Sequence, residues 1–199
     1  KFLPRRCLNV LRNLIVPERL VLMERDLKSL FLWQYQSLAK GANQRDDLRN
    51  HEFKIYSKIG EDGLILHIFS KIGATNYRFV EFGVEDGKEC NTANLSLNFG
   101  WQGLLVDANK EQIENAKAYY KSTKVKPVHC FVTAENINQL LIDHGFSGEI
   151  DLLSIDIDGN DYWVWKAITA INPRVAIIEY NASFGFDKPI TVKYDPNFH

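Results

Sequence analysis

The stretch Phe79-Val80-Glu81-Phe82-Gly83-Val84-Glu85-Asp86-Gly87 decides the fold of this chain. An apolar run that ends in closely spaced glycines predicts a strand and a sharp turn, because glycine lets the backbone approach a ligand without a Cβ in the way. A dinucleotide site would have G-x-G-x-x-G there, with a pyrophosphate held on exposed amides. The carboxylates of Glu85 and Asp86 would repel a pyrophosphate. They suit a cationic ligand, although an ordinary strand-to-helix turn accounts for the glycines as well.

Short apolar runs alternate with helical stretches at a near-constant interval from residue 55 onward. The runs cover residues 77–82, 103–107, 128–132, 151–157 and 174–180. The helical stretches cover residues 90–98, 111–121, 136–144 and 161–170, preceded by a helical face at residues 64–72. This alternation predicts an α/β fold, in which a mostly parallel sheet is buried by helices on both faces.

Polar residues close each of the predicted strands, at the edge where ligands of parallel sheets bind. Asp107 comes twenty-four residues after Gly83. A carboxylate at that place and distance can accept both hydroxyls of an adenosine ribose; the alternative is an N-cap of the helix at 111–121. The other strand-end residues are Glu81, Thr133 to Asn136, Asp156 with Asp158, and Glu179 with Asn181.

The bulk composition narrows the class of protein. The chain has 199 residues, enough for one well-buried domain with an accessory element, and a net charge of -1 that gives no reason to expect a nucleic-acid partner. No apolar run approaches the ~18 residues of a membrane span. Three cysteines without a C-x-x-C pattern predict neither a disulfide framework nor a zinc site, so we expect reduced thiols and a cytoplasmic protein.

Residues 1–50 differ in pattern from the rest, and we expect them to form a helical extension and linker ahead of a Rossmann-like domain at 51–199. Apolar residues recur at helical spacing between Pro17 and Gly41, and a polar linker follows. A helix packed on the flank of the domain is the plainer interpretation. A lid, a homodimer surface or a membrane-surface element are the alternatives.

Four linked motifs carry a resemblance to a known family. They are Ile55-Tyr56-Ser57-Lys58-Ile59-Gly60-Glu61-Asp62-Gly63, Phe79-Val80-Glu81-Phe82-Gly83, Gly103-Leu104-Leu105-Val106-Asp107-Ala108-Asn109 and Asp151-Leu152-Leu153-Ser154-Ile155-Asp156-Ile157-Asp158-Gly159. Over about residues 55–195 the chain resembles the FkbM-type branch of class I S-adenosylmethionine-dependent methyltransferases. The resemblance implies a seven-stranded sheet with S-adenosylmethionine across the first two strand ends. It also implies methylation of a hydroxyl on a small molecule, sugar or glycan.

The resemblance assigns roles to individual residues. Glu81, Gly83 and Gly87 would line the methionine part of the cofactor. Asp107 would take the ribose, and Ala134 and Glu135 would lie beside the adenine. The residues expected to contact the cofactor are Glu81, Gly83, Glu85, Gly87, Asp107, Ala108, Asn109, Ala134, Glu135 and Asp156.

The chain also departs from the family pattern. Relatives often have Gln at the position of Lys58. The positive charge of Lys58 would be unfavourable near a sulfonium unless Glu61 or Asp62 pairs with it. Relatives also tend to have Glu at the position of Asp158. The sixth and seventh strands of the family sheet are absent, and the sequence begins without Met. We therefore expect a fragment or trimmed form of a longer protein.

The ends of the fourth and fifth predicted strands raise the question of a metal. Residues two apart in a strand share a face, so Asp156 and Asp158 would point the same way if the strand runs on, as would Glu179 and Asn181. Hard oxygen ligands of this kind suit Mg²⁺, which in some O-methyltransferases holds the acceptor hydroxyl. In the metal-free alternative Asp156 is a general base or fixes the cofactor's amino group, with Asp156 and Asp158 as the catalytic candidates. Asp158 as a cap of the helix near Asp161 is a third interpretation.

Two other classes of function stay open beside a methyltransferase. A non-catalytic module that keeps the fold for binding is one, and a nicotinamide-dependent oxidoreductase, disfavoured by Glu85 and Asp86, is the other. Trp163 and Trp165 could wall an acceptor pocket or belong to a buried helix.

Overall fold

The computed structural model describes residues 48–185 and 189–198. The chain divides into two compact units, Lys1–Asp47 and Leu48–His199, and all described residues belong to the second. The helix predicted between Pro17 and Gly41 lies outside the described residues, as do its proposed flank, lid and dimer roles. A short 3-10 helix, η1 (Leu48–His51), spans the domain boundary predicted at residue 50.

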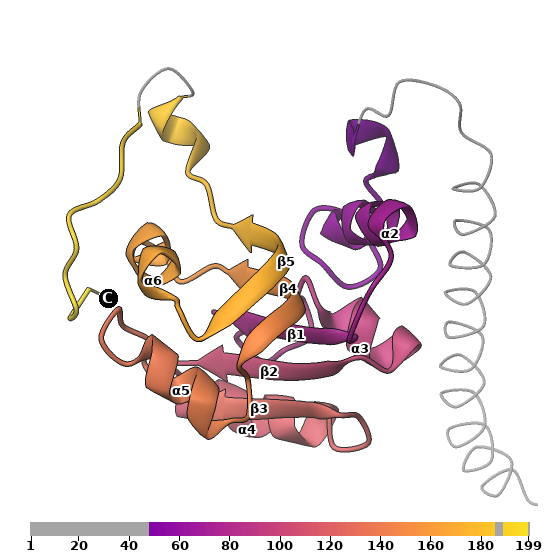
Figure 1. The fold of residues 1–199 in the computed structure, drawn as a ribbon, viewed down its shortest axis with the longest axis horizontal. Helices are drawn as coiled ribbons and strands as arrows, with labels where there is room; N and C mark the ends of the chain where they lie inside the picture. The colour runs from indigo at the N-terminus through magenta and orange to yellow at the C-terminus, as the bar shows by residue number, and fades with distance from the viewer. Residues whose placement is uncertain (1–47, 186–188, 199) are drawn as a thin grey trace, which may run out of the picture. The chain divides into compact units, whose positions relative to one another are not determined.

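The described part of the second unit contains a five-stranded sheet in the order β3-β2-β1-β4-β5, and every neighbouring pair is parallel (Figure 1). The predicted α/β, Rossmann-like fold is therefore confirmed. The strands are β1 (Arg78–Phe82), β2 (Gln102–Asp107), β3 (Val125–His129), β4 (Gly148–Ile155) and β5 (Ile171–Ile178). The helices are α2 (Glu61–Ile72), α3 (Ala93–Phe99), α4 (Lys110–Tyr119), α5 (Ile137–Asp143) and α6 (Asp161–Ala167), with a 3-10 turn η2 (Ala182–Phe184) near the end.

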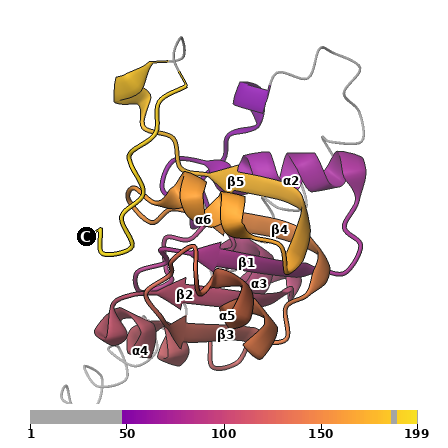
Figure 2. The ribbon, with the colours of Figure 1, turned by 60° about the vertical axis from the view of Figure 1, so that its left-hand side comes forward.

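Helices cover both faces of the sheet, because successive residues of a strand point to opposite sides and both sides are apolar here. In β1, Val80 belongs to a core that includes Ile137 of α5 and Val164 of α6. Its neighbour Phe79 belongs to the opposite core, which includes residues of α2, α3 and α4. Figure 2 shows α5 and α6 in front of the sheet, with α2 and α3 behind it.

Three strands, β3, β4 and β5, differ from the predicted ranges by two or three residues at each end. β3 begins at Val125 and ends at His129; it is an edge strand of the described sheet, and its residues are partly or fully exposed. A partly exposed strand that contains Pro127 gives no continuous apolar run, and an outer strand tolerates the missing N–H of proline. β4 ends at Ile155 and β5 at Ile178, two residues earlier than predicted. The acidic residues that follow therefore lie on loops.

The strand order creates a crevice at the carboxyl edge of the sheet. From β1 the chain moves outward to β2 and β3, then returns to place β4 on the other side of β1. Such a switch point between β1 and β4 is where open α/β sheets bind ligands. Phe82 is opposite both Val106 and Ile155, and Ile155 is opposite Ile178. The residues that follow these positions are Gly83, Asp107, Asp156 and Glu179, which therefore end the four strands at one level.

Asp151 of β4 ties the opposite edge of the sheet together. Its buried carboxylate accepts the N–H groups of Thr75, Asn76 and Tyr77 at 2.6–3.1 Å. It also pairs with Arg174 of β5 at 2.8 Å. Burial alone would raise the pKa of Asp151, but these donors outweigh it and hold the pKa below its usual value. Asp151 thus has a structural role far from the crevice.

Candidate cofactor and acceptor site

A pocket of about 450 Å³ lies at the carboxyl ends of β1, β2, β4 and β5. The residues that end these strands, Gly83, Asp107, Asp156 and Glu179, all line it. Its volume is in the usual range for a small-molecule site. The other lining residues are Lys58, Glu85, Val106, Ala108, Cys130, Phe131, Val132, Ile157, Asp158, Asn160 and Phe198.

The two glycines of the turn after β1 are required for different reasons. Gly83 has φ of 76°, and a Cβ there would lie 1.6 Å from the carbonyl oxygen of Asp156. Gly87 has φ of 78°, and a Cβ would lie 2.7 Å from the ring of Tyr120. The Tyr120 hydroxyl donates to the carbonyl of Gly87 at 2.6 Å. Gly83 lines the pocket, whereas Gly87 is fixed by packing beneath the turn.

Asp107 connects this turn to the end of β2. Its Oδ2 accepts the N–H of Glu85 at 2.8 Å, and its Oδ1 accepts the N–H of Asn109 at 2.7 Å. Glu85 has φ of 50°, a left-handed conformation that is uncommon outside glycine and clusters at functional sites. Asn109, rather than Asp107, caps α4, since it accepts the N–H groups of Glu111 and Gln112. The helix-cap alternative for Asp107 is therefore wrong.

Glu81 serves the local structure of the next helix. Its side chain is 5% exposed, and it accepts the N–H groups of Asn91 and Thr92 at 2.9 and 3.0 Å. Ser154 of β4 donates a further bond at 3.3 Å. Burial raises the pKa of Glu81 even though these donors favour its charged form. Glu81 lines a second pocket of about 320 Å³, which shares Lys58, Gly83, Glu85 and Asp156 with the first.

The loop before α2 is folded around Asp62. One buried carboxylate oxygen of Asp62 accepts the N–H groups of Ile55, Tyr56 and Ser57 and the Ser57 hydroxyl, all at 2.7–2.8 Å. Glu61 accepts the N–H of Ile59 at 3.0 Å. This loop positions the next residue of the motif, Lys58, beside the crevice.

Lys58 pairs with Glu85, and not with Glu61 or Asp62, the two partners considered from the sequence. Its Nζ lies 3.6 Å from Glu85 Oε1, while Glu61 and Asp62 bind the backbone of their own loop. Partial burial lowers the pKa of Lys58, but the nearby carboxylates of Asp156, Glu85 and Asp158 outweigh it and raise the pKa above its usual value. Lys58 is therefore a stable ammonium group at the junction of the two pockets.

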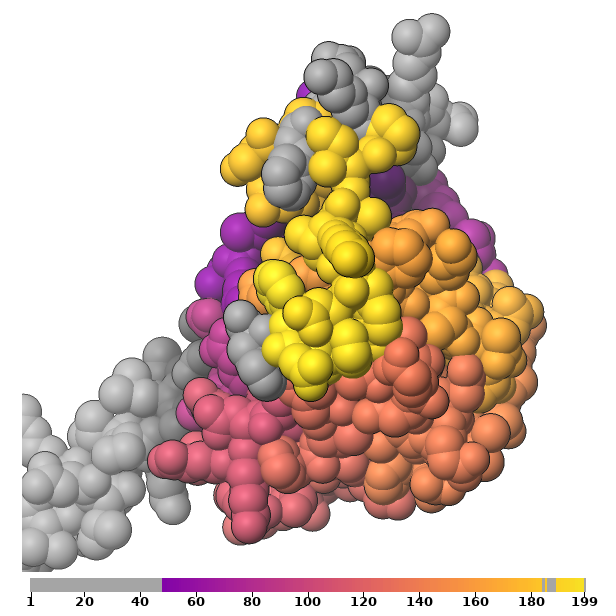
Figure 3. Space-filling model, turned by 90° about the vertical axis from the view of Figure 1, so that its left-hand side faces the viewer, coloured from indigo at the N-terminus to yellow at the C-terminus, as the bar shows by residue number. Residues whose placement is uncertain are grey.

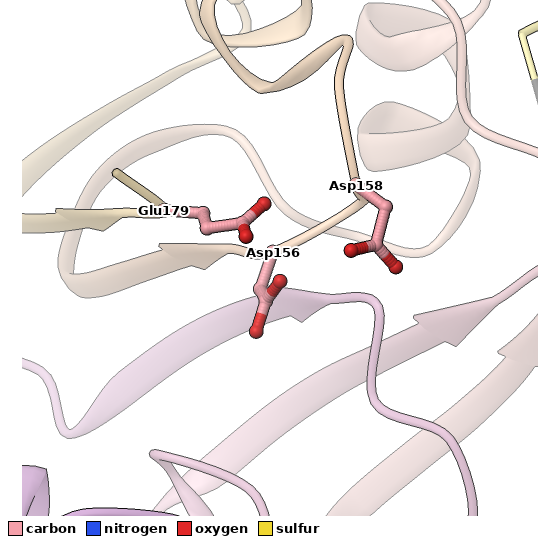
Figure 4. Close-up of side chains that lie close together, drawn as sticks. All are labelled: Asp156, Asp158 and Glu179. Atoms are coloured by element: carbon pink, nitrogen blue, oxygen red, sulfur yellow. The ribbon is translucent and has the colours of Figure 1, made fainter. Parts of the chain in front are cut away.

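Three carboxylates converge at one side of the main pocket (Figure 4). One oxygen each from Asp156, Asp158 and Glu179 lies within 4.8 Å of the others. Burial and then the charges of Asp158 and Asp161 raise the pKa of Asp156, against the opposing effect of Lys58. Burial and then Asp156 raise the pKa of Glu179. Crowded carboxylates of this kind favour a bound proton or cation.

Asp156 and Asp158 do not lie close together for the reason predicted. β4 ends at Ile155, and Asp158 has φ of 54°, so Asp156 and Asp158 are not on one extended strand. Asp158 does not cap α6 either, because the N-cap position is occupied by Asn160. Asp161 accepts the N–H groups of Ile157 and Gly159 and closes this turn. Asn181, the fourth predicted metal ligand, uses its side-chain oxygen to accept the N–H of Ser183. The metal set stays a prediction.

The residues assigned to the adenine lie beside the pocket and do not line it. The hydroxyl of Tyr194 accepts the N–H of Ala134 at 3.2 Å and donates to Glu135. Cys130, Phe131 and Val132 line the pocket in their place. Sequence reasoning missed them because it placed residues 128–132 inside a strand. Ala108 lines the pocket as predicted from the resemblance.

The C-terminal tail, residues 189–198, contributes Phe198 to the lining of the main pocket. Asn160 donates to the carbonyl of Asp195 at 2.7 Å and Trp163 to that of Val192 at 2.8 Å. A Cβ on Gly159 would lie 2.5 Å from the ring of Phe198, so the ring packs directly against this glycine. Figure 3 shows the yellow C-terminal residues lying across this face of the domain. Phe198 gave no signal in the sequence, because it is isolated there from the motifs.

A third pocket, of about 440 Å³, adjoins the first. Asp158, Glu179 and Phe198 line both. Trp165 lines it and is 45% exposed, which favours a pocket role over the alternative of a buried helix residue. Trp163 instead holds the tail that forms one wall. Further lining residues are Gly159, Asp161, Tyr162, Ile178, Tyr180, Asn181, Gly185, Ile190, Thr191 and Val192.

A parallel sheet with a switch point between β1 and β4, and a ligand-sized pocket at that point, define a Rossmann-like α/β domain. Residues 49–198 match the family model described as Methyltransferase FkbM domain, so the chain belongs to the FkbM methyltransferase family. Membership supports a methyltransferase function in general and, with it, the use of S-adenosylmethionine. A comparison with curated proteins found no match. Among the described residues, none of the helices has the length and apolar character that crossing a membrane requires.

Proposed function

We propose that this domain binds S-adenosylmethionine in the main pocket and methylates the hydroxyl of an uncharged small molecule, sugar or glycan bound in the adjoining pocket. The observation that carries the proposal is the alignment of four strand ends, Gly83, Asp107, Asp156 and Glu179, around one pocket. The cofactor supplies an electrophilic methyl group on a sulfonium.

The residues present fit such a cofactor. Five of the described residues that line the main pocket are carboxylates, which suits a ligand with a sulfonium and an ammonium group. Each oxygen of Asp107 accepts one backbone N–H, and a carboxylate oxygen can accept a second donor. Asp107 therefore has capacity left for two ribose hydroxyls. Phe131 and Val132, beyond the end of β3, offer apolar surface for the adenine.

The adjoining pocket fits the acceptor. Asp158 and Glu179 line both pockets, so an acceptor hydroxyl beside them would lie next to the cofactor site. Tyr162, Trp165 and Tyr180 line the acceptor side and are 41–51% exposed. Its three carboxylates, including Asp161, would repel an acidic acceptor. An uncharged, hydroxyl-bearing molecule with a face that can pack on aromatic rings is the acceptor class favoured.

Asp156 is the proposed base. A general base works best when its pKa lies near the operating pH, and burial with neighbouring acids moves the pKa of Asp156 upward. Asp156 would take the proton of the acceptor hydroxyl, while Asp158 and Glu179 orient it. Holding the acceptor oxygen in line with the methyl group supplies the rest of the rate enhancement.

Calorimetric titration of the full chain with S-adenosylhomocysteine, and separately with NADH, tests the proposal. We expect the first ligand to bind and the second not to bind. Failure of S-adenosylhomocysteine to bind would overturn the proposed function, and binding of NADH alone would favour an oxidoreductase. Methyl transfer to a panel of neutral sugars and aromatic alcohols is then measured with and without EDTA. Loss of transfer in EDTA, restored by Mg²⁺, would contradict the metal-free role of Asp156.

A further inference from the structure

The charged residues that line the main pocket are acidic, with one exception. Glu85, Asp107, Asp156, Asp158 and Glu179 line it, and among the described residues that line it the one cation is Lys58. The proposed methyl donor carries two cationic groups and one anionic group, the α-carboxylate of its methionine part. The acidic side chains of the pocket repel this α-carboxylate unless a cationic side chain pairs with it.

Lys58 is held in place to meet such a group. The N–H of the preceding residue, Ser57, is fixed by the buried carboxylate of Asp62, and the carbonyl of Lys58 itself accepts a bond from Lys54 at 3.1 Å. Gly60 ends this loop with φ of 119°, a conformation that favours glycine. The backbone of Lys58 is therefore anchored on both sides, and its side chain reaches Glu85 on the glycine turn.

We propose that the ammonium of Lys58 binds the α-carboxylate of the methyl donor, an inference that rests on the proposed function. Lys58 lines the main pocket and also the second pocket, where Glu81 and Gly83 lie and where the methionine part is expected. The 3.6 Å separation from Glu85 is a loose ion pair, with 54% of the Lys58 side chain exposed, so the ammonium has donors to spare for a ligand.

Lys88 is the second cation among the described residues that line the second pocket, and it is the competing candidate. Its ammonium pairs with Asp86, two residues away on the same exposed turn. Lys88 does not line the main pocket, whereas Lys58 lies where the two pockets meet. The carboxylate of a ligand that reaches from one pocket into the other would therefore meet Lys58.

The test compares two ligands that differ by one group, S-adenosylmethionine and its decarboxylated form, by calorimetric titration of the full chain. Removing a positive charge from the pocket by Lys58→Gln should tighten both cationic ligands if Lys58 acts only through its general field. If Lys58 binds the carboxylate, the variant should bind S-adenosylmethionine about tenfold more weakly. Affinity for the decarboxylated form should stay unchanged or rise.

Three variants complete the design. Lys58→Arg keeps the charge and should retain affinity for both ligands, which would show that the fold tolerates substitution at this position. Binding of the decarboxylated ligand by Lys58→Gln shows that this variant is folded. Lys117→Gln removes an exposed lysine that pairs with Glu114 on α4, away from the pockets, and should change neither affinity. Lys88→Gln should also leave the ratio of the two affinities unchanged.

The outcomes separate the two levels of the proposal. Equal weakening of both ligands by Lys58→Gln, unchanged or tighter binding of S-adenosylmethionine, or a selective effect of Lys88→Gln in its place would overturn the role of Lys58 alone. Absence of binding of both ligands to the unchanged protein would overturn the proposed function itself.

Discussion

The backbone N–H of Glu85 donates a 2.8 Å hydrogen bond to Oδ2 of Asp107, joining the turn after β1 to the end of β2. This bond holds Glu85 in its left-handed conformation at the mouth of the main pocket. The same carboxylate is the one proposed to take the ribose. The shape of the turn and the binding of a ligand therefore depend on one side chain.

Replacing Asp107 by Asn should weaken the binding of S-adenosylhomocysteine by at least tenfold, because hydrogen bonds to a charged group contribute about 1.5–3 kcal/mol. The amide keeps an oxygen for one backbone donor, so the fold should survive. Calorimetric titration measures the affinity and circular dichroism checks the fold. Asp143→Asn, on the exposed end of α5, is the matched control. Full affinity in the Asp107 variant would remove that residue from the site.

Substitution of Gly83 by Ala should destabilise the domain by about 3 kcal/mol or more, because the new Cβ would meet the carbonyl oxygen of Asp156. Gly145→Ala is the matched control. It shares a positive φ but has no atom within 4 Å of the new Cβ, so only conformational strain of about 1 kcal/mol is expected. Urea unfolding gives both values. Equal losses in the two variants would show that the close approach of β1 and β4 is unimportant.

Asp151→Asn should lower the free energy of unfolding by about 3 kcal/mol at pH 7, because it breaks a buried pair with Arg174. The pKa of Asp151 is lowered in the folded state, so its contribution is present at neutral pH and is lost as the pH falls below about 4. The difference in the free energy of unfolding between the variant and the unchanged protein should therefore disappear below about pH 4. Binding of S-adenosylhomocysteine should be unchanged where both proteins are folded, since Asp151 lies at the opposite edge of the sheet.

Asp156→Asn, in contrast to Asp151→Asn, should make the folded protein more stable at pH 7. Its pKa is raised in the folded state, so the folded protein keeps a proton that the unfolded chain releases above about pH 4. Asp156 therefore costs stability as the pH rises through that window, and the variant should gain thermal stability at pH 7 but not at pH 4. The same variant should abolish methyl transfer. A variant that is less stable at pH 7, or that keeps full activity, would contradict the role assigned to Asp156.

The sheet and the strand ends could be predicted from sequence because their signals are local. An apolar run such as residues 79–82 followed by Gly83 indicates a buried strand and turn without knowledge of its neighbours. The predicted range for β3, residues 128–132, is three residues too late, because an edge strand that contains Pro127 has no continuous apolar run. The carboxylates of Asp156 and Glu179 were expected to meet, since parallel strands end at a common edge.

The rest of the site depends on contacts between segments far apart in the chain. The pairing of Lys58 with Glu85 bridges two loops, and nothing near Lys58 in the sequence predicts it. Phe198 reaches the pocket because Asn160 and Trp163 hold the tail. From the sequence alone, Asp62 could have been an ion-pair partner of Lys58. In the structure its buried carboxylate instead accepts N–H groups of the loop before α2.

The central claim is that the main pocket holds an adenosyl ligand, and a crystal structure of the full chain with S-adenosylhomocysteine tests it most directly. We predict ligand density beside Gly83, with both ribose hydroxyls within hydrogen-bonding distance of Asp107 and the α-carboxylate next to Lys58. Ligand density elsewhere, or a ribose that does not contact Asp107, would contradict the account.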